Sequence, residues 1–232
     1  MVADLELRKR AAAEHALEYV RDGTVLGLGS GSTAEIFLAG LAERVRQGLD
    51  VVAVPTSERT AALARAAGIP LSSLDQEPRL AVSVDGADEI DPATLALIKG
   101  RGGALLREKL VAAASDQEII VADDSKLVSR LGERRPVPVE VVRFGWQQTA
   151  RRLERLGCSV NLRIGDDTPT PFVSDEGHLL LDCAFGPIPD PAKLASEIKS
   201  IVGVVEHGLF IGLTHRVVIG CADWVQVLEA PR

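Results

Sequence analysis

Short apolar runs alternate with helical patterns along the first half of this chain, and polar residues follow several of the runs. Strands separated by helical stretches pair in parallel, because the helix carries the chain back to the start of the next strand. The order therefore predicts an α/β fold, with a Rossmann-like, mostly parallel sheet and helices on both of its faces. The apolar runs are residues 24–28, 51–54, 80–84, 95–98 and 118–122, and the helical stretches are residues 5–21, 34–47, 61–67 and 104–114.

The pattern changes after Leu131, where the next few residues, up to Pro138, have the composition of a linker. From there the expected order is strand, helix, strand, strand, helix and strand, which is the βαββαβ order of ferredoxin-like folds. These elements are expected at residues 139–142, 146–156, 159–164, 178–183, 191–201 and 204–210, and a last run at residues 214–219 is expected to return to the first sheet. We predict a Rossmann-like domain of residues 1–133 and 213–232 and a smaller, ferredoxin-like α+β domain of residues 134–212.

The composition of the chain excludes several classes of protein. With 26 basic and 33 acidic side chains its formal net charge is −7, and it has only five Phe, two Trp and one Tyr, so we expect no nucleic-acid partner. No apolar run reaches the roughly 18 residues of a membrane-spanning helix, and the charged N-terminus lacks the apolar core of a signal sequence. The three cysteines, at positions 158, 183 and 221, are widely spaced, and the four histidines have no metal-like spacing. We therefore expect a cytoplasmic protein without a membrane partner, a disulfide framework or a metal.

The first candidate site is the sequence Gly27-Leu-Gly-Ser-Gly-Ser-Thr-Ala34, which joins a strand to a helix. Its glycines let backbone N–H groups surround an anion, and the helix N-terminus and the hydroxyl groups favour a phosphate. From Gly29 the spacing also fits the dinucleotide motif GxGxxA, but that site expects an acidic residue at the end of the second strand, which here reads Val54-Pro-Thr56. A tight turn that only caps the helix is a third interpretation.

The second candidate is the sequence Asp85-Gly-Ala-Asp-Glu-Ile-Asp91, which places four carboxylates directly after an apolar strand. Ligands of open α/β sheets bind at the carboxyl ends of the strands. Carboxylates crowded there repel one another, which raises the pKa of one of them toward the range useful for acid-base catalysis. A solvated acidic loop and a divalent-metal site are the alternatives, although the spacing does not fit an EF-hand calcium loop.

The third candidate runs from Lys99 through a glycine-rich turn into the helix at residues 104–114. That helix is apolar nearly all round except for Arg107, Glu108 and Lys109, which predicts that it is buried. Burial would raise the pKa of the Glu108 carboxyl toward that of a useful base, unless the three charges extend to solvent. Lys99 is expected to face the same crevice as Asp85.

A fourth candidate, Lys126, follows the strand at residues 118–122. As a point charge it could bind a phosphate, or it could be an ordinary exposed lysine of a turn. The combination of the four candidates is more specific than any one of them. One anion site, two sources of carboxylate and two cations follow successive strands of a sheet whose carboxyl edge is the expected ligand site.

The motifs of this chain resemble those of ribose-5-phosphate isomerase type A in order and spacing, and the likeness runs nearly from end to end. They are Gly29-Ser-Gly-Ser-Thr-Ala34, Asp85-Gly-Ala-Asp-Glu89, Lys99-Gly-Arg-Gly-Gly-Ala104, Arg107-Glu-Lys109, Ala122-Asp-Asp-Ser-Lys126, Pro136-Val-Pro-Val-Glu140 and Gly208-Leu-Phe-Ile-Gly212. The resemblance implies an enzyme of the non-oxidative pentose phosphate pathway that interconverts D-ribose 5-phosphate and D-ribulose 5-phosphate through an enediolate, without a metal or an organic cofactor. It also implies a homodimer or a dimer of dimers.

The resemblance further implies a role for each matching residue. Glu108 would be the base that moves a proton between C1 and C2, and Asp85 would help to open the furanose ring. Lys99 would stabilise negative charge on the substrate oxygens, and Asp88 would support the polar network. The substrate-binding residues implied are Ser30, Gly31, Ser32 and Thr33 at the phosphate with Lys126 nearby, and Gly86, Ala87, Gly100, Arg101 and Gly102 in the rest of the pocket.

Two positions depart from the pattern of that family. Ser30 stands where the family more often has Thr, which keeps the hydroxyl group, and Arg101 stands where it often has Gly. The second change leaves open whether the Arg101 side chain points into the site or to solvent.

Two other functions are weighed against the isomerase, a related sugar-phosphate deaminase or coenzyme A transferase and a sugar-phosphate-sensing domain of a transcription regulator. The sensing domain would need a helix-turn-helix, and only about 20 residues precede the first expected strand.

Overall fold

The computed structural model describes residues 2–165 and 169–230 and divides the chain into two compact units. The first unit consists of the described parts of Met1–Ala87, Arg107–Lys126 and Leu213–Arg232, and the second of those of Asp88–Leu106 and Leu127–Gly212. No helix within the described residues has the length and apolar character needed to cross a membrane.

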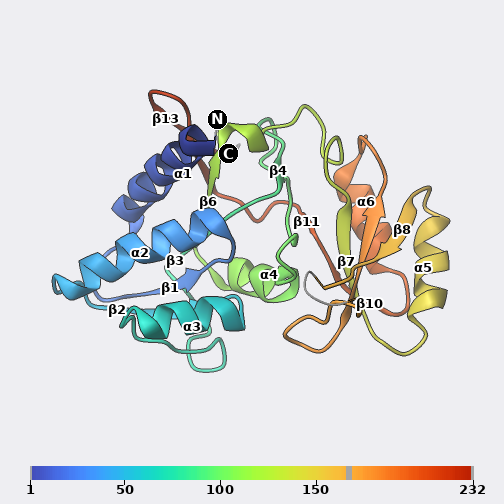
Figure 1. Ribbon diagram of the computed structural model, residues 1–232, viewed down its shortest axis with the longest axis horizontal. Coiled ribbons are helices and arrows are strands. Elements are labelled where there is room, and N and C mark those ends of the chain that lie inside the picture. Colours follow the sequence, from blue (N-terminus) through green and yellow to red (C-terminus); the bar gives the residue numbers. More distant parts are fainter. Residues whose placement is uncertain (1, 166–168, 231–232) are drawn as a thin grey trace. The chain divides into compact units, whose positions relative to one another are not determined.

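A six-stranded sheet forms the centre of the first unit, with the strand order β13-β12-β6-β3-β1-β2 (Figure 1). All its neighbours pair in parallel except β12 and β13, which are antiparallel. The expected run at residues 214–219 does return to this sheet, because β12 pairs with β6. The strands are β1 (Thr24–Leu28), β2 (Val51–Pro55), β3 (Val82–Asp85), β6 (Glu118–Asp123), β12 (Arg216–Gly220) and β13 (Val225–Glu229).

Helices cover both faces of this sheet, as predicted. Helices α1 and α2 share an apolar core with β1, β3, β6 and β12, to which Ala16 and Phe37 belong. Helix α4 packs on the opposite face, where Val111 meets β1 so closely that a Cβ on Gly27 would lie 2.4 Å from its side chain. The helical elements are α1 (Val2–Ala16), η1 (Leu17–Tyr19), α2 (Ser32–Arg46), α3 (Glu58–Ala66), α4 (Leu105–Ala114) and η2 (Asp124–Lys126), and the first two residues of α4 belong to the second unit.

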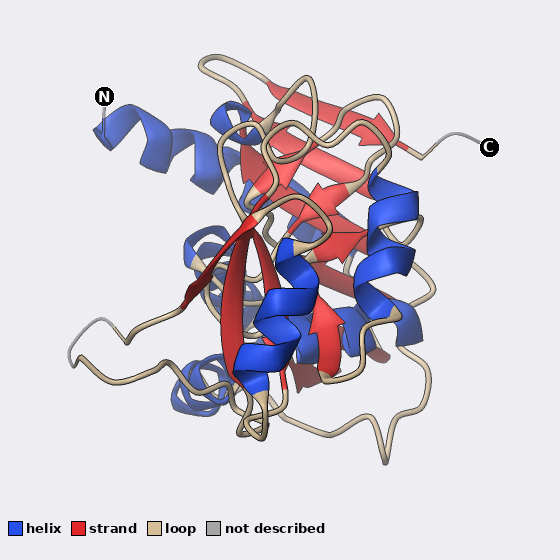
Figure 2. Ribbon diagram, turned by 90° about the vertical axis from the view of Figure 1, so that its right-hand side faces the viewer, coloured by secondary structure: helices blue, strands red, loops and turns tan. Residues whose placement is uncertain are grey.

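The second unit contains an antiparallel sheet of the order β10-β7-β9-β8, and its chain order is the predicted βαββαβ. Helices α5 and α6 pack on one face of it, since alternate residues of β7 and β9 share a core with both helices (Figure 2). The opposite face of β9 carries Leu180 and Asp182. The elements are β7 (Val137–Val141), α5 (Trp146–Glu154), β8 (Ser159–Leu162), β9 (Leu179–Ala184), α6 (Pro191–Lys199) and β10 (Val204–His207).

A three-stranded sheet of the order β11-β5-β4 corrects one expectation from the sequence. Residues 95–98 were expected to extend the large sheet, but β5 (Leu97–Ile98) forms a hairpin with β4 (Glu89–Ile90) and also pairs with β11 (Leu209–Phe210). The segment between β3 and β5 contains no helix. A parallel neighbour needs a crossover of about a dozen residues or more, usually helical, so β5 turns back as an antiparallel strand instead.

Candidate active site

The strand order places a topological switch point beside β1. From β1 the chain moves to β2 at one edge, and it then returns to β3 on the other side of β1. Neighbouring loops therefore leave in opposite directions at the carboxyl ends of β1 and β3, which is where open α/β sheets bind their ligands. The segments that follow these two strands are Gly29–Thr33 and Asp85–Ala87.

The turn after β1 presents the N-terminus of α2. Gly31 precedes this helix with a φ of 93°, a conformation that favours glycine, and its carbonyl accepts a hydrogen bond from Glu35 N at 2.9 Å. Gly31 has no side chain that could cap α2. The first N–H groups of a helix also have no partner within the helix. Ser32 is exposed and Thr33 is buried. The turn can therefore hold an anion with backbone N–H groups and two hydroxyl groups.

A cluster of hydroxyl groups fixes Ser30. Its Oγ lies 2.8 Å from Thr56 Oγ1, 3.0 Å from Ser57 Oγ and 3.2 Å from Thr60 Oγ1. Thr60 Oγ1 in turn donates to the Gly29 carbonyl at 3.0 Å. The cluster ties the turn after β1 to the start of α3. The sequence of residues 54–56 shows that a carboxylate is absent there, but it gives no signal that the hydroxyl groups of this segment hold the turn after β1.

Asp85 is tied to the same turn. Its Oδ1 accepts hydrogen bonds from Ser30 N at 2.9 Å and Gly86 N at 2.7 Å, and the residue is 2% exposed. A Cβ on Gly29 would lie 2.3 Å from Asp85 Cγ. Glycine at position 29 is thus what lets the carboxylate reach the turn.

Three cations lie on elements of the first unit that border this edge. Lys9 of α1 donates from Nζ to Ser32 Oγ at 3.1 Å. Arg8 forms an ion pair with Asp124 at 2.7 Å, and hydrogen bonds to Asp124 and Asp4 raise the pKa of the Arg8 guanidinium. Lys126 is half-buried in η2, directly after β6. Sequence reasoning missed Lys9, because one lysine on a charged surface helix gives no signal of its contact with a distant turn.

Helix α4 carries Glu108, which is 5% exposed, so its predicted burial is observed. The neighbouring charge, Arg107, reaches outward and pairs with Glu58 at 2.9 Å. That guanidinium holds the pKa of the Glu58 carboxyl below its usual range. The two adjacent charges of α4 therefore have different surroundings, and only Glu108 is sequestered from water.

The second unit holds the remaining predicted residues around one glycine-rich turn. Lys99 is 3% exposed, its N–H donates to the Gly208 carbonyl at 2.8 Å, and its Nζ lies 5.4 Å from the centre of the Phe210 ring. Asp88 Oδ2 accepts a hydrogen bond from Arg101 N at 3.0 Å. Asp88, Arg101 and Gly102 line a cavity of about 440 Å³ in this unit, and Arg101 is exposed.

The four carboxylates of residues 85–91 belong to both units, Asp85 to the first and the other three to the second. The chain directs each of them to its own hydrogen-bond donors. Glu89 accepts from Gly132 N and Arg134 N, both at 2.6 Å, and Asp91 accepts from Ala93 N at 2.9 Å and from Thr94 Oγ1 at 2.7 Å. Glu89 and Asp91 therefore stabilise loops and the β4–β5 hairpin.

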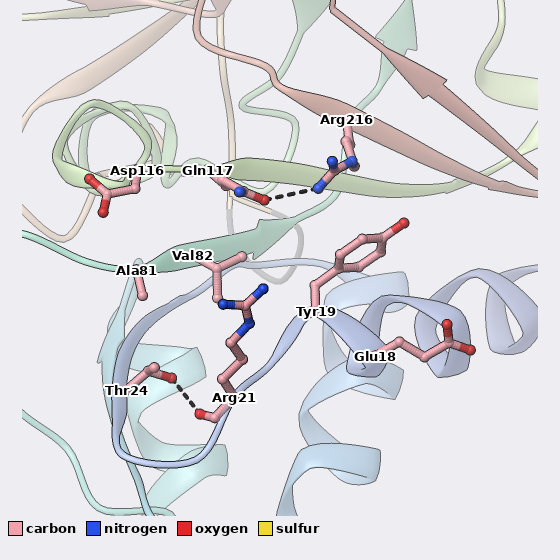
Figure 3. A pocket seen from close by; sticks show the side chains of 9 residues that line it. All are labelled: Glu18, Tyr19, Arg21, Thr24, Ala81, Val82, Asp116, Gln117 and Arg216. Carbon is pink, nitrogen blue, oxygen red and sulfur yellow. Dashed lines mark hydrogen bonds between the residues drawn. The ribbon is translucent and has the colours of Figure 1, made fainter.

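A second cavity, of about 380 Å³, lies at the opposite edge of the six-stranded sheet (Figure 3). Residues at or next to the amino ends of β1, β3, β6 and β12 line it, together with residues of η1 and the turn that follows. None of the predicted site residues belongs to its lining. The lining residues are Glu18, Tyr19, Arg21, Thr24, Ala81, Val82, Asp116, Gln117 and Arg216.

Residues 52–224 match the protein family described as Ribose 5-phosphate isomerase A (phosphoriboisomerase A). The ribose-5-phosphate isomerase A of Synechococcus sp. (strain JA-3-3Ab) is 53% identical over 229 residues, which cover 98% of this chain and 99% of that protein. The protein of the same name from Gloeobacter violaceus is 54% identical over 225 residues, which cover 97% of each.

Solved structures agree with this match. A D-ribose-5-phosphate isomerase in complex with phospho-erythronic acid is similar with a TM-score of 0.94 at 39% identity, covering 97% of this chain and 99% of that one. The ribose 5-phosphate isomerase A of Methanocaldococcus jannaschii has a TM-score of 0.92 at 39% identity, covering 95% of this chain and 97% of that one.

Proposed function

The chain belongs to the ribose 5-phosphate isomerase A family, and from this premise we propose how its residues interconvert D-ribose 5-phosphate and D-ribulose 5-phosphate. The reaction moves a proton between C1 and C2 through an enediolate. It needs an anchor for the phosphate, a base at the two carbons and a positive group at the oxygens where charge develops. The observation that carries the proposal is the turn at the switch point, where an open helix N-terminus, buried hydroxyl groups and a fixed carboxylate occur together.

The phosphate is proposed to bind at residues 30–33. The N–H groups at the start of α2 and the hydroxyl groups of the turn would surround its oxygens. Lys9 already donates to Ser32 Oγ, and Lys126 follows β6, so both are proposed to supply positive charge. This local site reconciles an anionic substrate with a formal net charge of −7, because a single phosphate does not require an extended basic surface.

Asp85 is proposed to help open the furanose ring. Ring opening removes the proton of the C1 hydroxyl group and protonates the ring oxygen, so it needs a group that can accept a proton and release it again. The bonds from Ser30 N and Gly86 N fix the orientation of the Asp85 carboxylate, which keeps it in one place for this transfer. Gly86 and Ala87 follow directly and are proposed to contact the sugar.

Glu108 is proposed as the base of the enediolate step. It would take the proton from C2 of the aldose and return it to C1, which yields the ketose. Its burial supports the role, because little water competes with the substrate for the Glu108 carboxylate. When C2 loses its proton, negative charge develops on the carbonyl oxygen at C1. This oxygen needs a nearby cation.

Lys99 is proposed to be that cation. It is buried, and its backbone N–H is bound to Gly208, so the ammonium group sits on a fixed part of the chain. Asp88 holds Arg101 N of the following turn, and Gly100, Arg101 and Gly102 are proposed to complete the pocket. A buried ammonium group can stabilise an enediolate oxygen strongly, because little water screens it.

The test is ketose formation from D-ribose 5-phosphate with EDTA present. Wild-type enzyme is expected to turn over, and Glu108→Gln is expected to lower kcat by about 100- to 10,000-fold, the usual contribution of a positioned base. Binding of phospho-erythronic acid, measured by calorimetry, should survive this substitution, since the phosphate site is intact. Absence of turnover in the wild type would contradict the function, and an active Glu108→Gln variant would contradict the base.

We also propose that the enzyme acts in the cytoplasm as a homodimer or a dimer of dimers. The three cysteines, all in the described part of the chain, form no disulfide, which fits a reducing compartment. The second unit exposes Phe144 and Val202, 95% and 78% accessible, which supports a contact surface there. Light scattering on the purified protein should give two or four times the chain mass of 24.7 kDa. A mass of one chain would contradict the proposal.

A further inference from the structure

Arg163 follows β8 and contacts the turn after Lys99. Its Nη1 donates to the Gly100 carbonyl at 2.8 Å and to the Arg101 carbonyl at 2.9 Å. Only 14% of the Arg163 side chain is exposed. One nitrogen thus binds the first two carbonyl groups that follow Lys99.

Asp182 fixes the same guanidinium from the other side. Arg163 Nε donates to Asp182 Oδ2 at 3.0 Å, and Nη2 bonds to Asp182 Oδ1. Asp182 stands on β9 in register with Asn161 of β8, on the sheet face that α5 and α6 do not cover. A planar guanidinium can bind a carboxylate with two parallel bonds and still present a third donor, whereas a lysine ammonium cannot match this geometry.

The two carbonyl bonds orient the peptide groups of the turn. In a trans peptide the N–H points away from the C=O, so the bond to the Gly100 carbonyl turns the next N–H away from Arg163. Arg101 N does point to another partner, Asp88 Oδ2 at 3.0 Å. Arg163 and Asp88 therefore hold the peptide group between Gly100 and Arg101 from opposite sides.

This turn needs such support. Gly100 and Gly103 have φ values of 102° and 85°, and glycine has the largest conformational freedom of all residues. The cavity of about 440 Å³ borders the turn, so it lacks dense apolar packing at Arg101 and Gly102. Phe172 and Leu180 pack against Gly103, while the hydrogen bonds from Arg163 restrict Gly100 and Arg101.

We propose that Arg163 is a positioning residue for the isomerisation. Held by Asp182, it fixes the carbonyl groups of Gly100 and Arg101 and thereby keeps Lys99 and the turn after it in the geometry that stabilises the enediolate. The proposal rests on the function assigned to Lys99 above. It predicts an effect on the chemical step rather than on the phosphate, since a displacement of about 1 Å at reacting groups can cost on the order of 100-fold in rate.

The experiment compares Arg163→Met and Arg163→Lys with the matched control Arg135→Met, which removes another arginine from the wall of the same cavity. For each variant, kcat, KM, the inhibition constant of inorganic phosphate and the unfolding temperature are measured. Arg163→Met is expected to lower kcat about 10- to 100-fold, with KM and phosphate inhibition within about twofold. Arg163→Lys should recover part of kcat, because it restores one donor and the charge. Arg135→Met should match the wild type.

Two outcomes would overturn the proposal. One is an unchanged kcat in Arg163→Met, and the other is a parallel loss of kcat, phosphate affinity and unfolding temperature that Arg163→Lys does not relieve. If Arg163→Met does not fold, Asp182→Asn replaces it, and a kcat at the wild-type level in that variant would equally contradict the role. Lys99→Met in the same assay separates the two proposals, because full activity there refutes the function of Lys99 itself.

Discussion

The two edges of the six-stranded sheet are both polar, yet they are built differently. At the carboxyl edge Asp85 and the Ser30 hydroxyl group are bound to backbone N–H groups and to other hydroxyl groups, and Asp85 is almost fully buried. At the amino edge Arg216 donates to Gln117 at 2.9 Å (Figure 3). Arg216 also binds Glu229 at 3.1 Å, and Asp116 pairs with Arg79 at 2.6 Å. There the charged side chains mostly form ion pairs with one another at the surface.

This difference teaches what distinguishes a site from a polar cavity. Exposed ion pairs adjust to solvent and contribute little, typically about 0–1 kcal/mol each. Groups held by the backbone keep their orientation when a ligand binds, so their dipoles point toward the ligand without rearrangement. Glycine makes this possible at the carboxyl edge, since Gly29 leaves room for Asp85 and Gly31 opens the helix N-terminus. Cavity volume alone would not separate the two edges.

Among the changes that compare the two edges, Gly29→Ala is expected to have the largest effect. The added Cβ would lie 2.3 Å from Asp85 Cγ, so the carboxylate or the turn must move. We expect kcat to fall about 100-fold, and the free energy of unfolding to fall by about 1–3 kcal/mol. The matched control is Gly23→Ala at the amino edge, where a Cβ would meet nothing within 4 Å. That variant should lose stability through its positive φ but keep its activity. Equal activity of the two variants would remove the distinction between the edges.

A smaller effect is expected from Ser30→Ala. It deletes the hydroxyl group that joins Thr56, Ser57 and Thr60 and that is proposed to contact the phosphate. KM should rise about tenfold and inorganic phosphate should inhibit less, because one hydrogen bond to a charged ligand is worth about 1.5 kcal/mol. Ser30→Thr should restore both values, and Thr24→Val, which removes a hydroxyl group at the amino edge, should change neither. A KM at the wild-type level in Ser30→Ala would exclude the contact.

The smallest effect is expected from Arg216→Met. The substitution breaks the bonds to Glu229 and Gln117 and the contact with the Tyr19 ring, whose centre lies 5.1 Å from the guanidinium. The free energy of unfolding in urea should fall by about 1 kcal/mol. The ratio kcat/KM should stay within about twofold of the wild type. A loss of activity larger than this would show that the amino edge contributes to catalysis.

Most of the fold could be predicted because it depends on local patterns. The run at residues 24–28 was expected as a strand and is one, and the βαββαβ order of the second unit was expected from periodicity alone. The prediction that residues 95–98 extend the large sheet was wrong, because an apolar segment carries no information about which sheet it joins. Its partner β11 lies more than 100 residues away in the chain, and such pairing leaves no local signal. Strand β13 was not expected for a related reason, since most of it is only half-buried.

The motifs of the candidate site could be predicted from the sequence, but the residues that hold those motifs in place could not. Glycine, hydroxyl and acidic residues after apolar runs indicated the turn at Ser30 and the carboxylate at Asp85. Lys9, Thr60 and Arg163 were not expected, because each acts through a contact with a segment distant in sequence. A lysine or threonine in a helix has many ordinary reasons to be there, and only the tertiary structure selects one of them.

The pairing of β12 with β6 also governs how the first unit can fold. The whole region from Leu127 to Gly212 separates these two parallel strands, so their contact closes a very long loop. Contacts of such high order form late and slowly. Until β12 pairs with it, one side of β6 is an open sheet edge whose central residues, 119–122, are apolar, and such an edge is a template for aggregation. We therefore expect substitutions in β12 to lower the yield of folded protein before they lower catalytic activity.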